Sequence, residues 1–438
     1  MFGCLPLSQA EEEKREGAIQ RKNVRILVHQ DEDRRVALAS ALAPPPPRPA
    51  GPLELSAAYR PTLQSVISKL KSTKGQDGST LIIALMSPVL SGQFRRHKSL
   101  VWPEQQSILA GMYSLLSVVC SQLNVPTEVD GGPGSVDARV VLVDHDATKR
   151  IAEDFKLAIE PNNTVIVNLT TFIAAYHPWK QIFSANTEAG HQQLHNYLRM
   201  YEGVQILNQD QLITVDGGLT LNTQSLESAQ ASRLTTTPHS VVCLGGTFDH
   251  LHPGHKLLLT AAILLLKVPD EGSSEPCSLV VGITGDELLK NKKYAEFVQP
   301  WEERAMSVIE FLSSMLELQK QGWKGGATPK ITKKDGEMTA LFRSDTISVS
   351  CVQIQDAFGP TISQENMDAL VVSGETRAGG AAVNAKRTEL GWHPLQIFEV
   401  DVLSAEEVAD ELPTKTEENF ASKISSTAIR KMRAESHM

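Results

Sequence analysis

The second half of the chain alternates short apolar runs, rich in β-branched residues, with longer segments of helical length. The apolar runs lie at residues 241–244, 279–284, 347–354, 369–372 and 396–402. The helical segments lie at residues 255–267, 300–318, 381–390 and 426–433. Strands that alternate with helices of these lengths form a parallel sheet with helices on its faces. We therefore predict an α/β fold with a doubly wound parallel sheet for residues 239–438.

The first half of the chain also alternates. Short buried strands are expected at residues 79–86, 139–143 and 164–169, and a helix at 102–123. These elements predict an additional N-terminal α/β domain over residues 23–204, to which the sequence assigns no chemistry. Its Asp144-His145-Asp146 run offers metal-ligand side chains. A turn at a strand end is the favoured interpretation, because no further ligands can be assigned.

Several other segments are expected to be tails or connections. Residues 1–22 are polar and charged, which predicts disorder, and a strand is expected at 23–29. The proline-rich stretch at 44–52 predicts an extended spacer, with a partner-binding motif as the alternative. Residues 205–238 are rich in Gln, Ser and Thr and are expected to connect the domains. Residues 321–345 are expected to form a flexible insertion.

The composition is that of a globular protein with an acidic surface. Apolar residues make up 41% and charged residues 21%, and the net charge is -9. This balance argues against nucleic acid or an anionic membrane as a partner. No apolar run reaches the length of about 20 residues that a membrane span requires. Five cysteines without a CxxC pair predict free thiols in a reducing compartment. The cytoplasm is the expected location, with the nucleus as an additional one.

A glycine-rich turn joins the apolar run at 241–244 to the following helical segment. The turn begins with Gly245 and Gly246, which permit a tight bend and close approach of the backbone to a ligand. His252 and His255 stand three residues apart at the start of the helix and so share one face. The helix start also offers unpaired N–H groups and a positive dipole end. Together these features predict a site for phosphate oxygens at the carboxyl edge of the sheet.

Two better-known phosphate-binding patterns are absent from the sequence. There is no GxGxxG dinucleotide fingerprint, and no GxxxxGKS or GxxxxGKT loop. Either histidine alone would be interpreted as a solvated turn residue. The whole arrangement of strand, Gly-Gly-Thr-Phe-Asp, His-x-Gly-His and helix favours a functional site.

The sequence GTFDHLHPGHKLLL resembles the signature of the nucleotidyltransferase superfamily, whose hallmark is T-x-x-H or H-x-G-H. Three later segments, at residues 286–304, 358–380 and 423–430, narrow the resemblance to the eukaryotic, fungal-type pantetheine-phosphate adenylyltransferases. The last segment, KISSTAIR, is similar to the family's I-S-S-T/S-x-x-R motif. The resemblance covers residues 239–435 and implies a Rossmann-like sheet of the H-x-G-H nucleotidyltransferase type.

The resemblance implies that AMP passes from ATP to 4'-phosphopantetheine, giving dephospho-coenzyme A and pyrophosphate. It implies catalytic roles for His252, His255, Lys290 and Lys292. The implied ATP-binding residues are Gly246, Thr247, Phe248, His255, Ser425, Ser426, Thr427 and Arg430. The implied phosphopantetheine-binding residues are Thr247, Lys290 and Arg377. Mg²⁺ would arrive with ATP, since it prefers phosphates and waters to a cage made of protein.

Other functions remain open at this point. A cytidylyltransferase for a phosphorylated alcohol shares GTFD and HxGH, but its usual RTxGISTT motif is absent here. A nicotinamide mononucleotide adenylyltransferase would lack the Glu-Thr-Arg-Ala-Gly-Gly region. A scaffold for coenzyme A-synthesising enzymes is the alternative from another class. Animal-type relatives carry a dephospho-coenzyme A kinase with a P-loop, so a kinase on a separate chain is an expected partner.

Overall fold

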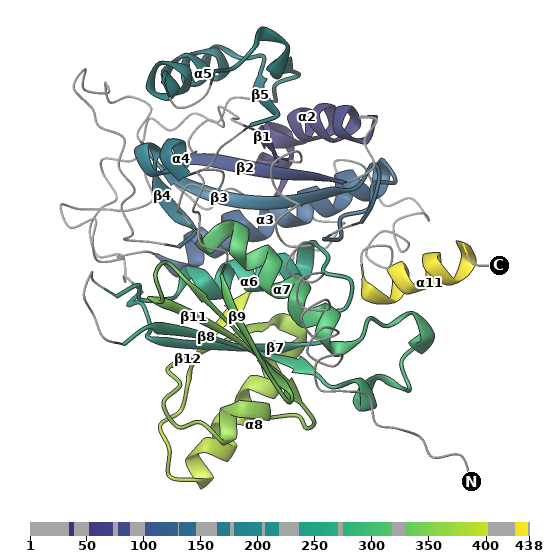
Figure 1. The fold of residues 1–438 in the computed structure, drawn as a ribbon, viewed down its shortest axis with the longest axis vertical. Helices are drawn as coiled ribbons and strands as arrows, with labels where there is room; N and C mark the ends of the chain where they lie inside the picture. The colour runs from purple at the N-terminus through teal and green to yellow at the C-terminus, as the bar shows by residue number, and fades with distance from the viewer. Residues whose placement is uncertain are drawn as a thin grey trace, which may run out of the picture.

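The computed structural model describes residues 35–38, 52–72, 78–87, 101–129, 131–145, 164–175, 179–203, 206–218, 236–269, 275–317, 329–401 and 425–436. The described elements form two sheets, with helices between them and outside them (Figure 1). The expected tail at 1–22, the expected strand at 23–29 and residues 44–51 of the proline-rich stretch lie outside the described residues.

The N-terminal sheet has six parallel strands in the order β4-β3-β2-β1-β5-β6. The strands are β1 (Arg35–Leu38), β2 (Ser79–Ser87), β3 (Val136–Asp144), β4 (Ile166–Asn168), β5 (Gln181–Ala185) and β6 (Leu212–Val215). The helices are α2 (Pro52–Lys71), α3 (Trp102–Gln122), α4 (Leu169–Ala175) and α5 (Glu188–Tyr201), with the short 3-10 turn η1 (Gln209–Gln211). The expected N-terminal α/β domain is therefore present.

The C-terminal sheet has seven strands in the order β13-β12-β7-β8-β11-β10-β9. The strands are β7 (Val241–Gly246), β8 (Cys277–Thr284), β9 (Lys330–Lys334), β10 (Glu337–Phe342), β11 (Ile347–Ile354), β12 (Ala369–Ser373) and β13 (Gln396–Val400). The helices are α6 (Pro253–Leu264), α7 (Trp301–Leu316), α8 (Arg377–Glu389) and α11 (Ser426–Ser436). Short 3-10 turns are η3 (Asp286–Leu289), η4 (Ala295–Phe297), η5 (Gly359–Ile362) and η6 (Gly374–Thr376).

Five of these seven strands are parallel and confirm the predicted doubly wound sheet. The parallel strands are ordered β13-β12-β7-β8-β11, so the chain starts in the middle, winds to one edge and then returns to the other. Short β-branched runs form the buried strands because their side chains pack on both covered faces. The expected bounds agree with the structure to within about four residues at most ends, which is the usual uncertainty of boundary prediction.

Two expected connections contain regular structure. Within the insertion expected at 321–345, β9 and β10 form an antiparallel hairpin that continues the sheet beyond β11. The prediction of a flexible segment was wrong for this part, because alternation in 337–342 places Met338, Ala340 and Phe342 in the core. The connection expected at 205–238 also begins too early, because β6 still pairs with β5.

The two sheets share one helical layer, formed by α3 from the N-terminal half and α6 and α7 from the C-terminal half (Figure 1). A single buried apolar cluster runs through this layer from one sheet to the other. Polar contacts cross it as well: Tyr113 Oη lies 3.0 Å from Thr260 Oγ1, and Arg139 Nε donates to Ser314 Oγ at 2.7 Å. The N-terminal domain is thus fastened to the helix that follows the glycine-rich turn.

Two further expectations concern cysteines and membranes. The four cysteines within the described residues are buried and free, as predicted: Cys120, Cys243, Cys277 and Cys351. Among the helices of the described residues, none combines the length and apolarity needed to cross a bilayer.

Candidate active site

The glycine-rich turn lies at the point where the strand order reverses. β7 pairs with β8 on one side and with β12 on the other. The chain moves outward from β7 to β8 and β11, then returns to β12. Helices leaving β7 and β12 therefore cover opposite faces, and a crevice is expected outside their carboxyl ends. The turn after β7 and η6 after β12 both start at this edge.

The backbone of the turn is strained and tightly anchored. Phe248 and His250 adopt left-handed conformations, with φ of 51° and 47°. Such angles are unfavourable for non-glycine residues and persist where the surroundings enforce them. The fully buried Arg304 provides part of that enforcement, because it donates to the carbonyl of Thr247 at 2.7 Å and to that of Gln299 at 2.8 Å. It also pairs with Asp286 at 2.6 Å. Arg304 therefore fixes the backbone of Thr247 at the edge of the sheet where the crevice is expected.

His252 and His255 lie face to face at the start of α6. Their ring centroids are 3.9 Å apart and the planes are inclined by 25°. Gly254 between them leaves room for this packing, because a Cβ there would lie 3.2 Å from His252 Cε1 and would push against that ring. In both rings Nδ1 is excluded from solvent without a hydrogen-bond partner among the described residues. Two covered imidazole nitrogens without partners are unusual in a folded protein, which makes this histidine pair a candidate functional feature.

The environment keeps both imidazoles neutral at neutral pH. Burial, with help from the positive charge of Lys256, lowers the pKa of His252 to about 4. Burial also lowers the pKa of His255 well below its ordinary value, and the neighbouring His252 adds to this effect. A polyphosphate at this position would reverse the balance, because an anion favours the charged form of an imidazole. Without a bound anion, both imidazoles are therefore uncharged.

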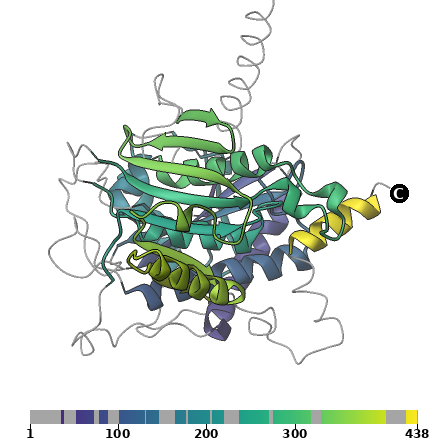
Figure 2. The same ribbon diagram turned by 90° about the horizontal axis from the view of Figure 1, so that it is seen from below.

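Helix α11 is fastened to the turn through Asp249, a residue that sequence reasoning did not single out. Arg430 NH1 lies 2.5 Å from Asp249 Oδ2, and Ser426 Oγ donates to the Asp249 carbonyl at 2.9 Å. Asp249 Oδ1 accepts from the backbone N–H of Gln299 at 2.9 Å. These contacts bring the start of the ISST segment against the turn, as the hypothesis of a shared site requires. Figure 2 shows α11 at one end of the C-terminal sheet.

Arg430 has a different environment from the one expected for a phosphate ligand. Its side chain is only 3% exposed, and it also donates to Lys293 O at 3.1 Å and Thr427 Oγ1 at 3.1 Å. The guanidinium therefore holds α11 in place and is committed to protein partners. Ser425 and Thr427 sit beside Ser426 at the start of the helix, where backbone N–H groups are available for an anion.

The other expected cations stand at the same edge of the sheet, on exposed loops. Lys290 follows η3, and its Nζ pairs with Glu287 at 2.5 Å; Lys292 is exposed on the same loop. Arg377 begins α8 after β12, and its guanidinium grips both carboxylate oxygens of Glu399. Among the described residues, Arg377 makes no hydrogen bond or ion pair with the histidines, although β12 pairs directly with β7. Lys290 would have to leave Glu287 to bind a phosphate, and a phosphate would compete with Glu399 for Arg377.

The residues missed by sequence reasoning are buried and polar. Arg304 stood within a segment that carried the resemblance, and Asp249 stood within the turn itself, so both were visible without an assigned role. Glu128, whose carboxylate lies 3.7 Å from His250, gave no sequence signal, because it comes from the N-terminal domain. Among the described residues, no group of three or more His, Cys, Asp or Glu side chains is arranged to hold a metal ion. Asp146 of the Asp144-His145-Asp146 run lies outside them.

Comparison with protein families divides the chain in two. Residues 34–221 match a domain of unknown function (DUF8446), and residues 243–432 match the cytidylyltransferase-like family. The C-terminal part is thus a nucleotidyltransferase-type domain, and the N-terminal part is an additional domain.

Individual relatives narrow the family. A phosphopantetheine adenylyltransferase from Pyrococcus abyssi is 32% identical over 164 residues, which are 37% of this chain and 80% of that protein. This chain belongs to the phosphopantetheine adenylyltransferase family. A family member from Saccharomyces cerevisiae is 34% identical over 44% of this chain and 48% of that protein. An uncharacterized protein from Schizosaccharomyces pombe is 37% identical over 43% of this chain and 47% of that protein. The match thus spans about half the length of the two fungal relatives.

Proposed function

We propose that this protein transfers AMP from ATP to 4'-phosphopantetheine, giving dephospho-coenzyme A and pyrophosphate. The observation that carries the proposal is the stacked pair of His252 and His255. Their buried, unsatisfied Nδ1 atoms stand at a helix start, at the switch point of a doubly wound sheet. Imidazoles beside the N–H groups of a helix start favour an anion, and a nucleoside triphosphate is one.

The reaction requires no covalent intermediate. An oxygen of the acceptor phosphate forms a bond to the α-phosphorus of ATP, and the bond from that phosphorus to the β-phosphate bridging oxygen breaks. The acceptor oxygen is already charged, so no general base is needed to activate it. The protein's task is to position two anions and to offset charge on the α-phosphate and leaving pyrophosphate.

The proposed ATP site lies between the start of α6 and the start of α11. His252 and His255 donate to the triphosphate, and their pKa values rise as it binds. The backbone of Gly246 and Phe248 lies beside the α-phosphate. Ser425 and Thr427 hold the β- and γ-phosphates through their hydroxyls, together with N–H groups at the start of α11. Ser426 can add its hydroxyl only after it leaves the Asp249 carbonyl. Because Arg430 is committed to Asp249, its proposed contribution to ATP binding is to hold that helix start in place.

The acceptor phosphate is proposed to lie between Thr247 and the exposed cations. Arg304 fixes Thr247 through its carbonyl oxygen, and the proposed phosphate contact is made by the Thr247 hydroxyl. Lys290 and Lys292 bridge the two reactants after Lys290 leaves Glu287. Arg377 grips the acceptor phosphate after leaving Glu399, in the bidentate geometry that guanidinium groups favour.

Magnesium is proposed to enter as part of the MgATP substrate. Among the described residues, no group of His, Cys, Asp or Glu side chains is arranged as a cage for the ion, and the carboxylate of Asp249 is committed to Arg430 and to the Gln299 N–H. Mg²⁺ is commonly held by substrate phosphates and water in such cases. No step is assigned to the ion beyond neutralising the phosphates it arrives with.

The proposal also covers partners and location. A separate dephospho-coenzyme A kinase would use the product, and the scaffold alternative would have the N-terminal domain bind such enzymes. The proposed location is the cytoplasm, with the nucleus in addition. A pull-down with the full-length protein tests whether it binds other enzymes of coenzyme A synthesis.

A pyrophosphate-release assay tests the activity. Purified protein is given ATP or CTP with each of several phosphorylated acceptors: 4'-phosphopantetheine, phosphocholine, phosphoethanolamine and nicotinamide mononucleotide. Release with ATP and 4'-phosphopantetheine alone supports the proposal. Release with CTP and a phosphorylated alcohol would replace it with the cytidylyltransferase alternative.

A further inference from the structure

A short loop of the N-terminal domain reaches the glycine-rich turn. The loop follows α3 and occupies residues 124–129. Near its start, the N–H of Val125 donates to Cys120 O at 2.8 Å, and Pro126 O accepts from the N–H of Val136 at 2.9 Å. Near its end, Glu128 O accepts from the N–H of Gly131 at 3.3 Å. These bonds anchor the loop to the helix and the strand beside it.

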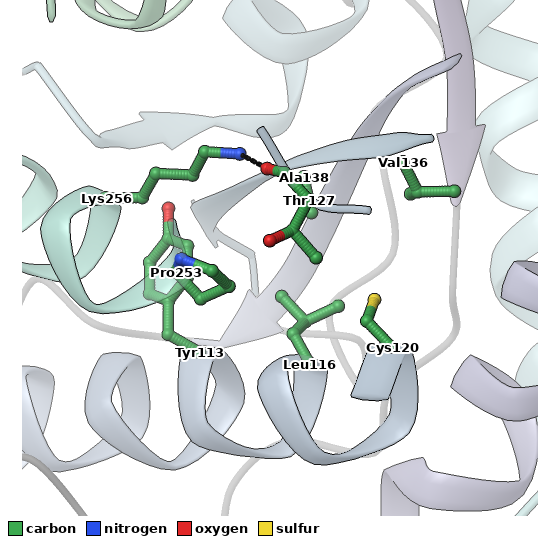
Figure 3. A pocket seen from close by; sticks show the side chains of 8 residues that line it. All are labelled: Tyr113, Leu116, Cys120, Thr127, Val136, Ala138, Pro253 and Lys256. Atoms are coloured by element: carbon green, nitrogen blue, oxygen red, sulfur yellow. Dashed lines mark hydrogen bonds between the residues drawn. The ribbon is translucent and has the colours of Figure 1, made fainter. Parts of the chain in front are cut away.

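The first contact of this loop is with α6, immediately after the histidine pair. Lys256 is 1% exposed, and its Nζ donates to Thr127 O at 2.6 Å (Figure 3). The same Nζ also donates to Asp137 Oδ1 at 2.5 Å. Asp137 is also buried and pairs with Arg139. A lysine this deeply buried is tolerated only with such partners. The N-terminal domain therefore fixes the position of the residue next to His255.

The second contact of the loop is with α11 and with the turn itself. Glu128 is 9% exposed; its Oε2 lies 2.5 Å from Arg433 NH2 and 3.7 Å from His250 Nδ1. Burial alone would raise the pKa of Glu128, but His250 and Arg433 lower it below its ordinary value. Its carboxylate thus stays charged between two elements of the C-terminal domain. Neither element is close to it in sequence.

The interface around Lys256 is closely packed. A cavity of about 10 Å³, room for about one water molecule, lies between Pro253 of α6 and Tyr113, Leu116 and Cys120 of α3 (Figure 3). A packed interface of this kind transmits a shift of one side directly to the other.

We propose that the loop at 124–129 positions the nucleotidyltransferase site. Glu128 holds the glycine-rich turn and helix α11 together, through His250 of the turn and Arg433 of the helix. Glu128 acts here as a positioning residue, since it contacts the turn and α11 and not the reacting atoms. The catalytic consequence rests on the proposed function. It makes the additional domain part of the enzyme's working site.

Two measurements on the full-length protein test the proposal. The variants are Glu128→Gln, Arg433→Gln and the double replacement. Hydrogen exchange of amides at 428–434 in the ligand-free protein reports how firmly α11 is docked, whatever the substrate. Steady-state pyrophosphate release reports kcat and KM. We expect faster exchange and a loss of about tenfold or more in kcat, because small displacements of catalytic groups are costly. The double variant should lose no more than the worse single variant.

A second ion pair on the same helix provides the matched control. Lys431 Nζ lies 3.7 Å from Glu435 Oε1, and both side chains are more than half exposed. Lys431→Gln and Glu435→Gln should leave exchange, kcat and KM unchanged. Thermal unfolding of every variant separates positioning from stability, since a purely structural role lowers Tm and leaves kcat per folded molecule unchanged.

The outcomes separate this proposal from the proposed function. Unchanged exchange at 428–434 in folded Glu128→Gln overturns the positioning role whatever the enzyme's substrate. So do unchanged kcat and KM, or effects of the two single variants that add. If the unsubstituted protein releases no pyrophosphate with ATP and 4'-phosphopantetheine, the proposed function fails. Accelerated exchange in Glu128→Gln would still support the docking role.

Discussion

Arg430 and Asp249, 181 positions apart in the chain, meet at 2.5 Å with both side chains almost completely buried. This ion pair joins the closing helix α11 to the turn that carries the histidines. Asp249 also accepts a hydrogen bond from Gln299, and Arg430 also donates to Lys293 and Thr427. A buried pair with its remaining hydrogen bonds made is costly to break from one side, because the other charge is left without a partner.

Replacing Asp249 by asparagine should therefore destabilise the protein. The buried guanidinium of Arg430 would lose its carboxylate, at a cost of about 3–5 kcal/mol. Urea unfolding of Asp249→Asn measures the loss. The exposed pair of Lys386 and Glu389, 2.8 Å apart on α8, is the control, and Glu389→Gln should change little. An Asp249→Asn protein as stable as this control would show that the pair does not hold α11.

The histidine pair predicts a dependence of stability on pH. The pKa of His252 is about 4 in the folded protein, against an ordinary value of 6.5. Because the folded pKa is depressed, the stabilising contribution is complete above pH 6.5 and is lost as pH falls towards 4. NMR titration of the imidazole measures the pKa directly. Lys256→Met should raise it, since the positive charge of Lys256 is one cause of the depression. A pKa near 6.5 in the unsubstituted protein would contradict the buried, neutral site.

The buried ion pairs of Asp137 with Lys256 and Arg139 predict that two replacements lower the free energy of unfolding by different amounts. Asp137→Asn leaves two buried cations, Lys256 and Arg139, without their carboxylate. It should cost about 3–5 kcal/mol of unfolding free energy. Lys256→Met leaves Asp137 with Arg139, so the loss should be smaller. Denaturant unfolding of both variants checks the order. A larger loss of unfolding free energy in Lys256→Met would contradict this order and would mean that Lys256 stabilises the interface independently of Asp137.

Glu399 competes with the proposed acceptor phosphate for Arg377, because it takes two of the guanidinium donors. Glu399→Gln should therefore lower KM for 4'-phosphopantetheine, by about two- to fivefold, the range expected for an exposed ion pair. Arg377→Met should raise the same KM with little change in KM for ATP. Initial rates with one substrate varied at a time separate the two constants. An unchanged acceptor KM in Arg377→Met would remove Arg377 from the binding site.

The architecture was largely predictable from the residues. The run at 347–354 coincides with β11, and the strand-helix alternation predicted the doubly wound sheet, because buried parallel strands need uninterrupted β-branched runs. The insertion hairpin was missed because Lys330–Lys334 reads as a charged loop and takes strand form only by pairing with its neighbour. Pairing of this kind is tertiary, and local sequence carries little of it.

The candidate site was predictable in its local part only. The contact of His252 with His255 follows from their spacing on one helix, and Gly254 explains how the rings approach. The partners of Arg430 were not predictable, since a guanidinium beside a helix start fits a phosphate as well as it fits Asp249. The role of Glu128 could not be predicted from the sequence, because it depends on how the two domains pack.

Pyrophosphate release by His255→Ala, compared with the unsubstituted protein, tests the central claim most directly. If the paired imidazoles stabilise a transferring phosphate, kcat with ATP and 4'-phosphopantetheine should fall by about a hundredfold or more while KM changes little, because the interaction strengthens in the transition state. His191→Ala, at an exposed histidine of α5, should leave both constants unchanged. A folded His255→Ala protein that keeps the original kcat would contradict the account.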